Sequence, residues 1–118
     1  MTPNHIAYLE LPANDITECK RFYGSVFGWN FEDYGPSYAA FSNSGLEGGF
    51  NADTSEKTRS PLPVIATSKI EAMVDRVVQA GGKITVPIFA FPGGRRFHFA
   101  DPEGNELAVM QPDAAPEA

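Results

Sequence analysis

Hydrophobic and polar residues alternate along this chain in patterns that predict two similar groups of strands and helices. Residues 5–12 alternate as in a half-buried strand, and Asp15 then precedes apolar residues at helical spacing. Gly28 ends this predicted helix. The apolar face of the helix is predicted to consist of Ile16, Cys19, Phe22, Tyr23, Val26 and Phe27. Three short strands are predicted to follow, at residues 30–34, 37–42 and 46–51.

The same order of elements returns after a polar stretch at residues 53–60. A strand is predicted at residues 63–67 and a helix at residues 70–80, which Gly81-Gly82 ends. The inward positions of this helix are predicted to be Ile70, Val74, Val77 and Val78. Three further strands end at Gln111, so the second half of the chain repeats the first.

The stretch HFADPEGNELAVMQ, residues 98–111, predicts the last hairpin of the second half. Asp101 can accept hydrogen bonds from nearby backbone amides, Pro102 presets its own φ, and Gly104 tolerates the positive φ of a tight turn. Apolar residues lie on both sides of this turn, as in two paired strands.

The repeat predicts an α+β fold within a single domain, residues 1–118. Two βαβββ modules are expected at residues 5–52 and 61–111, joined by a linker at residues 53–60 and followed by a flexible tail at residues 112–118. Neither copy alone would bury both faces of its sheet. We therefore expect the paired modules to form a curved eight-stranded mixed sheet, with two outer helices and a concave groove.

Composition narrows the classes of partner. The chain has 118 residues, 42% of them hydrophobic, which is enough for a core without a structural metal or disulfide. Its net charge of −6 argues against nucleic acid or an anionic membrane as a partner. It has one cysteine, no apolar run of membrane-spanning length, and no signal-peptide pattern at residues 1–4. These features predict a soluble cytoplasmic protein.

Three segments together resemble one protein family. LELPANDITECKRFYGSVFGW, VVQAGGKITVPIF and FADPEGNELAVMQ are similar to the vicinal oxygen chelate superfamily, also called glyoxalase, bleomycin resistance and dioxygenase proteins. The resemblance runs from Ile6 to Gln111. It implies paired βαβββ modules around a groove. It also implies that many members hold a divalent metal, with one ligand from the first and one from the last strand of each module, and use it as a Lewis acid.

The resemblance implies four positions for metal ligands, and three of them lack a donor side chain here. Ala108 stands where metal-binding relatives have a Glu. The equivalent place in the first module is Gly48-Gly49, and the third position falls in the apolar run at residues 63–66. The fourth lies in the register of Ile6 or Tyr8. We therefore expect no cofactor, with a divalent metal as the alternative.

Strand alternation predicts which side chains line the groove. Ala7, Leu9 and Leu11 form the row that should pack on the helix, and Leu107 and Val109 do so in the last strand. The opposite row is the predicted ligand-binding set: Tyr8, Glu10, Arg96, His98, Glu106 and Met110. His5 shares the register of the helix row, so we interpret it as a solvated side chain at a frayed strand end.

Each of these residues also has a purely structural interpretation. Glu10 and Glu106 can be solvated carboxylates on an open sheet face. His98 can be a hydrogen-bonded histidine between two phenylalanines, or a general base whose pKa a carboxylate neighbour raises. Arg96 can pair with either glutamate or clamp an anionic ligand. Cys19 lies on the core face of its helix and is interpreted as inert packing.

Two functions of different class fit this sequence. The first is a protein of the glyoxalase and bleomycin-resistance kind that binds a small, partly apolar molecule in its groove without a catalytic metal. The alternative is a metal-dependent lyase, isomerase or dioxygenase of the same superfamily. The empty ligand positions favour the first hypothesis.

We predict that the chain forms a homodimer, because small members of the resembling family commonly pair and apolar edge strands tend to be covered. Residues 84–89 are the candidate edge. Sedimentation velocity at micromolar concentration should give a species of twice the 12.8 kDa chain mass. A single species near the mass of one chain would rule the dimer out.

Overall fold

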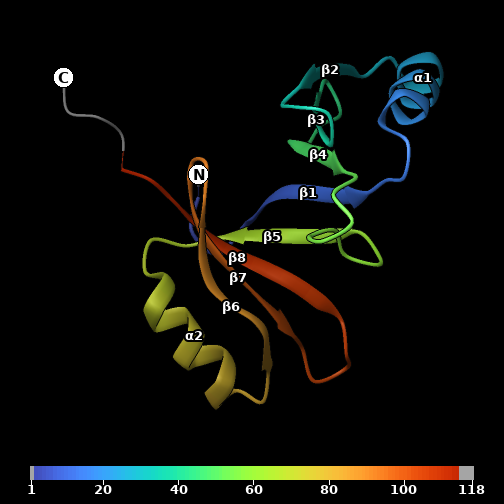
Figure 1. Cartoon of the computed structure of the whole chain (residues 1–118). Coiled ribbons are helices and arrows are strands. Elements are labelled where there is room, and N and C mark those ends of the chain that lie inside the picture. Colours follow the sequence, from blue (N-terminus) through green and yellow to red (C-terminus); the bar gives the residue numbers. More distant parts are fainter. Residues whose placement is uncertain (1, 115–118) are drawn as a thin grey trace. The chain divides into compact units, whose positions relative to one another are not determined.

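The computed structural model describes residues 2–114, which form an α+β fold with eight strands and two helices (Figure 1). Along the chain the elements are β1 (Ile6–Pro12), α1 (Ile16–Phe27), β2 (Asn30–Asp33), β3 (Tyr38–Ser42), β4 (Gly48–Asn51), β5 (Leu62–Ala66), α2 (Ile70–Gln79), β6 (Lys83–Phe91), β7 (Gly94–Ala100) and β8 (Glu106–Pro112). The order strand, helix and three strands occurs twice, which confirms the predicted repeat. The predicted flexible tail lies mostly outside the described residues, and its first residue, Pro112, ends β8.

Backbone contacts divide the chain into two compact units. Among the described residues, the N-terminal unit runs from Tyr8 to Pro63, and the C-terminal unit comprises residues 2–7 and 64–114. The strand order is β2-β3-β4-β1 in the first unit and β6-β7-β8-β5 in the second. In both, the first strand of the module pairs in parallel with the last, and the other pairs are antiparallel. The two modules therefore share one topology.

The core of the N-terminal unit lies between α1 and its sheet. Phe41 and Phe50 are buried there, and Tyr23 of α1 packs against them. Trp29, directly after the helix, stacks on Tyr23 with ring centroids 4.9 Å apart. The helix begins at the predicted cap, because the Asp15 side chain accepts a hydrogen bond from the Glu18 amide at 3.2 Å. It ends at Gly28, which has a φ of 73°.

The apolar face of α1 is wider than the surface that its sheet covers. Ile16, Cys19 and Tyr23 pack on the core as predicted. Phe22, Val26 and Phe27 were predicted on the same face but are exposed by 47%, 56% and 58%. An apolar stripe of this width extends round the helix beyond the contact line, so these three side chains lie on its flank. Phe22 and Phe27 instead pack edge to face on each other, with centroids 6.5 Å apart.

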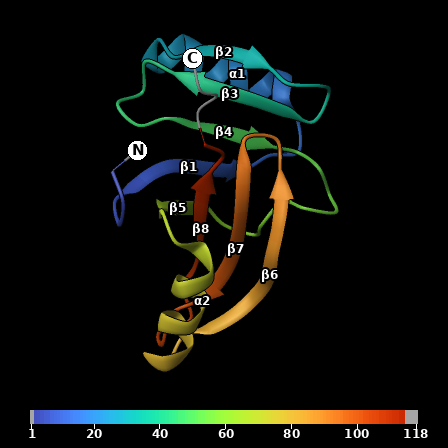
Figure 2. The same ribbon diagram turned by 90° about the vertical axis from the view of Figure 1, so that its left-hand side faces the viewer.

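The core of the C-terminal unit lies between α2 and strands β6, β7 and β8 (Figure 2). Ile70, Phe97 and Val109 are buried in it, and Val74 and Val77 pack against them. The prediction that Val78 also faces inward was wrong, because 54% of it is exposed. It directly follows the inward-facing Val77, and the 100° turn between neighbouring helical residues moves it off the contact line.

The turn between β7 and β8 has the predicted chemistry. The Asp101 carboxylate accepts hydrogen bonds from the amides of Glu103 and Asn105, both at 2.9 Å. Gly104 has a φ of 88°. Strand β6 is an edge strand of this unit, as expected for residues 84–89. It contains Pro87 and has two register shifts in its pairing with β7. Proline and bulges are typical of edge strands, since neither leaves a regular ladder for a further strand.

Two adjacent glycines allow close packing around β4. A Cβ atom on Gly48 would lie 2.2 Å from the Leu9 carbonyl oxygen. On the other face, a Cβ atom on Gly49 would lie 2.5–2.6 Å from the ring and hydroxyl of Tyr38. Both distances are too short for non-bonded atoms, so neither position accepts a side chain without movement of its neighbours.

We expect Gly49→Ala to destabilise the protein by about 1–3 kcal/mol, because Tyr38 must move to admit the methyl group. In a Tyr38→Ala background the same change should cost less than about 1 kcal/mol. Urea denaturation measures both values. The matched control is Gly24→Ala in α1, where the nearest atom to the new Cβ lies at 3.5 Å, and it should be neutral or stabilising. Equal losses in both backgrounds would exclude the Tyr38 contact as the cause.

Candidate functional site

In the N-terminal unit, Tyr8 and Glu10 project from the sheet face opposite α1. Leu11 pairs with Phe50 across β1 and β4, and both pack in the helix-side core. Glu10 pairs with Gly49, one residue earlier, and so faces the other way. The predicted orientation of β1 is confirmed.

Four polar side chains on this open face form a connected network. The Tyr8 hydroxyl is hydrogen-bonded to the Tyr38 hydroxyl. The Tyr38 hydroxyl donates to Glu10 Oε2 at 3.4 Å, and Asn51 Nδ2 donates to Glu10 Oε1 at 3.3 Å. Glu10 and Asn51 are each only 4% exposed. The interpretation of Glu10 as a solvated carboxylate is therefore wrong, because its side chain is buried.

Sequence reasoning missed Tyr38 and Asn51. Both were placed in predicted strands, but neither was assigned to the site. They pair with each other across β3 and β4, which puts them on the same face as Glu10. The available signal was Gly49, since a strand position without a side chain leaves room for a large neighbour, and here that neighbour is Tyr38.

In the C-terminal unit, Arg96, His98, Glu106 and Met110 share the sheet face opposite α2. Phe97 pairs with Val109 in the helix-side core. Arg96 pairs with Met110, and His98 pairs with Ala108, so these residues face away from the helix. The orientations predicted from strand alternation are confirmed for both strands.

His98 is buried and lies beside a carboxylate. It is 4% exposed, and its Nδ1 atom lies 3.5 Å from Glu106 Oε2. The same carboxylate oxygen accepts a hydrogen bond from the Thr85 hydroxyl at 3.1 Å, which holds Glu106 in place. The carboxylate neighbour on which the general-base interpretation of His98 depends is thus present.

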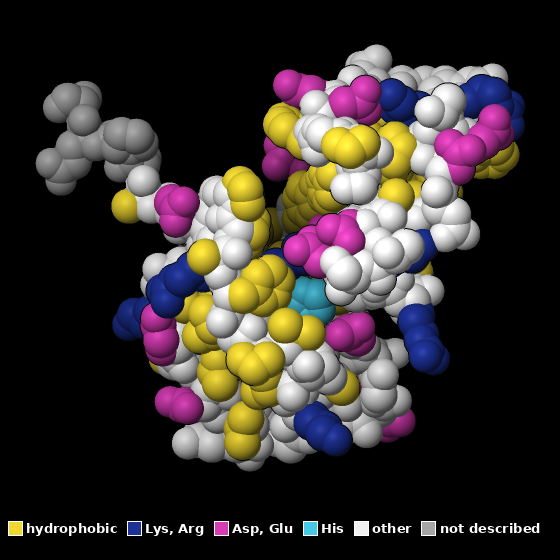
Figure 3. Space-filling view, viewed as in Figure 1, with side chains coloured by type: hydrophobic (Ala, Val, Ile, Leu, Met, Phe, Trp, Pro, Cys, Tyr) yellow, Lys and Arg dark blue, Asp and Glu magenta, His cyan; other side chains and the backbone are white. Residues whose placement is uncertain are grey.

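Arg96 lies among aromatic rings of the edge strand. Its guanidinium carbon is 5.3 Å from the ring centroid of Phe89 and 5.5 Å from that of Phe91, which are cation–π distances. The Phe89 ring also contacts His98, with centroids 5.9 Å apart. Figure 3 shows hydrophobic side chains gathered over the C-terminal unit, with charged side chains around them.

Two further residues behave as the sequence indicates. His5 is exposed and lies just before β1, consistent with a solvated side chain. Cys19 packs against the core of its unit. Burial, with Asp15 and Glu18 adding to it, raises the pKa of the Cys19 thiol, so the nucleophilic thiolate is scarce at neutral pH.

The residues at three of the family's four implied ligand positions do not fit a divalent metal. Tyr38 fills the space beside Gly49, and Ala108 is fully buried. Val64 and Ala66 are buried hydrocarbon side chains. A divalent cation needs several oxygen, nitrogen or sulfur ligands, which these positions lack. Within residues 2–114, no group of three or more His, Cys, Asp or Glu side chains is placed to hold a metal.

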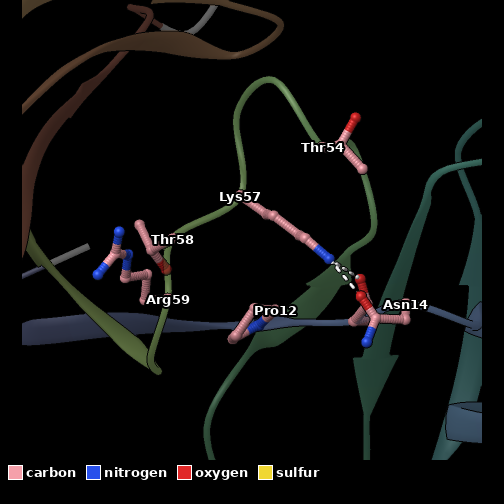
Figure 4. Close-up of a pocket in the computed structure, with 7 residues that line it drawn as sticks. Pro12, Asn14, Thr54, Lys57, Thr58 and Arg59 are labelled. Carbon is pink, nitrogen blue, oxygen red and sulfur yellow. Dashed lines mark hydrogen bonds between the residues drawn. The ribbon is translucent and has the colours of Figure 1, made fainter.

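A separate cavity of about 390 Å³ lies in the N-terminal unit, between the end of β1 and the polar stretch that follows β4 (Figure 4). Lys57 reaches across it and donates to the Ala13 carbonyl at 2.9 Å and to Asn14 Oδ1 at 2.5 Å. The ammonium group therefore ties the stretch to the strand. Thr54, Thr58 and Arg59 complete the rim.

Comparison with curated proteins gives relatives of greater length. CFP32 of Mycobacterium tuberculosis (strain CDC 1551 / Oshkosh), which carries the name of a glyoxylase, is 29% identical over 121 residues, covering 93% of this chain and 45% of that protein. The protein of the same name from Mycobacterium bovis matches equally. The chain thus spans about half the length of the curated relatives it matches.

No helix among residues 2–114 is long and apolar enough to cross a membrane.

Solved structures share the fold at low sequence identity. The hypothetical protein BH1468 from Bacillus halodurans C-125 has a TM-score of 0.75 at 13% identity, covering 99% of this chain and 100% of that one. The Mn(II)-bound glyoxalase from Novosphingobium aromaticivorans has a TM-score of 0.63 at 22% identity, covering 98% of this chain and 42% of that one. The family model described as Glyoxalase/Bleomycin resistance protein/Dioxygenase superfamily matches residues 3–109 of this chain, and the chain therefore belongs to that superfamily.

Proposed function

We propose that this protein binds a small, partly apolar molecule against the open sheet faces of its modules, without a catalytic metal. One observation carries the proposal: at three of the family's four implied ligand positions, this chain has residues that cannot bind a cation. Tyr38 takes the space at Gly49, and Ala108 is a buried methyl group. A superfamily member with these residues keeps the fold but lacks the ligands for a metal that acts as a Lewis acid. Binding is therefore the function that its remaining side chains support.

The residues on the open faces suit a ligand of mixed character. Small-molecule sites are mainly apolar and aromatic, with a few placed polar groups. Tyr8 and Glu10 are such groups in the N-terminal unit, and Arg96, His98 and Glu106 are such groups in the C-terminal unit. Met110 supplies a flexible apolar surface that adapts to the shape of a ligand.

The polar groups are held in place before any ligand arrives. Phe89 and Phe91 flank the Arg96 guanidinium, and Thr85 holds Glu106 beside His98. Side chains that are already ordered lose little conformational freedom on binding, which favours affinity for a small molecule. The alternative of a metal-dependent lyase, isomerase or dioxygenase would require metal ligands at three positions where this chain has none.

We expect the purified protein to hold less than stoichiometric divalent metal after dialysis at neutral pH, because three of the four implied ligand positions have no donor side chain. Elemental analysis by plasma mass spectrometry measures this. One tightly held Zn, Ni, Mn or Fe per chain would contradict the proposal and favour the enzyme. His5, His98, Glu10 and Glu106 would then be the first residues to test as ligands.

A thermal-shift screen should identify compact, partly aromatic ligands. A compound at a hundredfold excess over its Kd stabilises the folded state by about 2.7 kcal/mol, which is a readily measured shift in melting temperature. We expect Tyr8→Ala and Met110→Glu to abolish the shift, and His5→Ala to leave it intact as the matched control. The screen is run with and without added divalent metal. Hits only with metal present, or loss of the shift in His5→Ala alone, would contradict the proposal.

A further inference from the structure

The cavity at the end of β1 is lined by the basic residues of the polar stretch and not by its acidic ones. Residues 53–60 contain two acidic residues, Asp53 and Glu56, and two basic residues, Lys57 and Arg59. Both basic residues line the cavity, and its other lining residues are uncharged. The lining therefore has a positive charge, although the whole chain has a net charge of −6.

The acidic residues of the stretch do not neutralise this charge. The Asp53 carboxylate accepts hydrogen bonds from the amide and the hydroxyl of Ser55, at 2.9 Å and 2.6 Å. These bonds, the one from the hydroxyl first, hold the pKa of Asp53 below its usual value. Glu56 is exposed to solvent. Within residues 2–114, neither Lys57 nor Arg59 forms an ion pair with an Asp or Glu side chain.

Lys57 is held in the cavity by neutral groups. Its two acceptors, the Ala13 carbonyl and Asn14 Oδ1, orient the ammonium group without cancelling its charge. Figure 4 shows the side chain extending from the polar stretch toward Asn14. An ammonium group has three protons to donate, and these two bonds use two of them. Because Lys57 is partly buried, an anionic partner would offset the hydration that its charge has lost.

The remaining features of the cavity suit a small molecule with an anionic end. Its volume of about 390 Å³ falls within the range of roughly 300–1,000 Å³ that is typical of ligand sites. Pro12 and Ala13 supply hydrocarbon surface, and Thr54 supplies a hydroxyl group. Arg59 is exposed, so its guanidinium group can turn toward a ligand. The fork of N–H donors on a guanidinium matches the oxygens of a carboxylate or a phosphate.

We propose that this cavity binds the oxyanion group of a small molecule, either a carboxylate or a phosphate. Lys57 supplies a positive charge in a fixed position, and Arg59 supplies a second one from the rim. The cavity shares no residue with the predicted ligand-binding set on the open sheet faces. The inference therefore goes beyond the proposed function and does not rest on it.

The test uses inorganic phosphate, acetate, and acetamide as the neutral counterpart of acetate. Each is titrated into the full chain at constant ionic strength, and binding is followed by NMR at the backbone amides of Thr54, Lys57 and Thr58. We expect at least one anion to give a saturable response with a Kd of about 1 mM, and acetamide to give none. Saturation by phosphate alone would assign a phosphate ligand, and saturation by acetate alone would assign a carboxylate.

Arg59→Gln tests the site without disturbing the bonds of Lys57. Loss of this exposed charge should weaken anion binding about threefold or more. The matched control is Arg76→Gln, the same change at an exposed position of α2 outside the cavity, and it should leave the Kd unchanged. Lys57→Gln should weaken binding about tenfold or more. This variant also loosens the polar stretch, so Arg59→Gln is the deciding variant.

Three results would overturn the inference. The first is a response to both anions that stays linear well above the expected Kd. The second is a response to acetamide equal to that to acetate, since a neutral molecule does not need the positive charge. The third is an Arg59→Gln variant that binds the anion as tightly as Arg76→Gln does. The thermal shift of a ligand that depends on Tyr8 should be the same in Arg59→Gln as in the native protein, because the two sites are separate.

Discussion

Burial of one sheet face under a helix is the constraint on which each module of this protein depends. Phe50 under α1 and Phe97 under α2 are almost completely buried. Since side chains on a strand alternate between faces, anchoring these phenylalanines to the helix side also determines which of their neighbours lie on the other side. Tyr8 and Glu10 in one module, and Arg96 and His98 in the other, owe their orientation to this hydrophobic packing.

The parallel pairing of the first and last strands gives both modules the same central register. Glu10 lies opposite Gly49 in one, and Val64 lies opposite Ala108 in the other. These are the strands on which the superfamily resemblance implies metal ligands. The implied positions in β4, β5 and β8 hold small or apolar residues here, and the space next to Gly49 is occupied by Tyr38. Membership of the superfamily therefore establishes the fold of this chain, whereas its chemistry depends on the side chains that these strands carry.

Buried polar groups on the open face of the N-terminal unit satisfy one another. An unpaired carboxylate with the exposure of Glu10 would be strongly destabilising, and the bonds from Tyr38 and Asn51 offset that cost. The exposed Phe22, Val26 and Phe27 lie on the flank of α1 and have no part in this arrangement.

Local patterns in the sequence were sufficient to predict the elements, the repeat and the facing of single strands. Asp15, Gly28 and the Asp101 turn act within a few residues of where they stand, and alternation along β1 and β7 is a property of each strand alone. Only the tertiary structure decided that Tyr38 and Asn51, which lie 28 and 41 residues from Glu10, bond to its carboxylate. It also decided which residues of the apolar helix stripes stay exposed. Both outcomes depend on the register between strands and on the width of a packing surface, and these arise when distant segments pair in space.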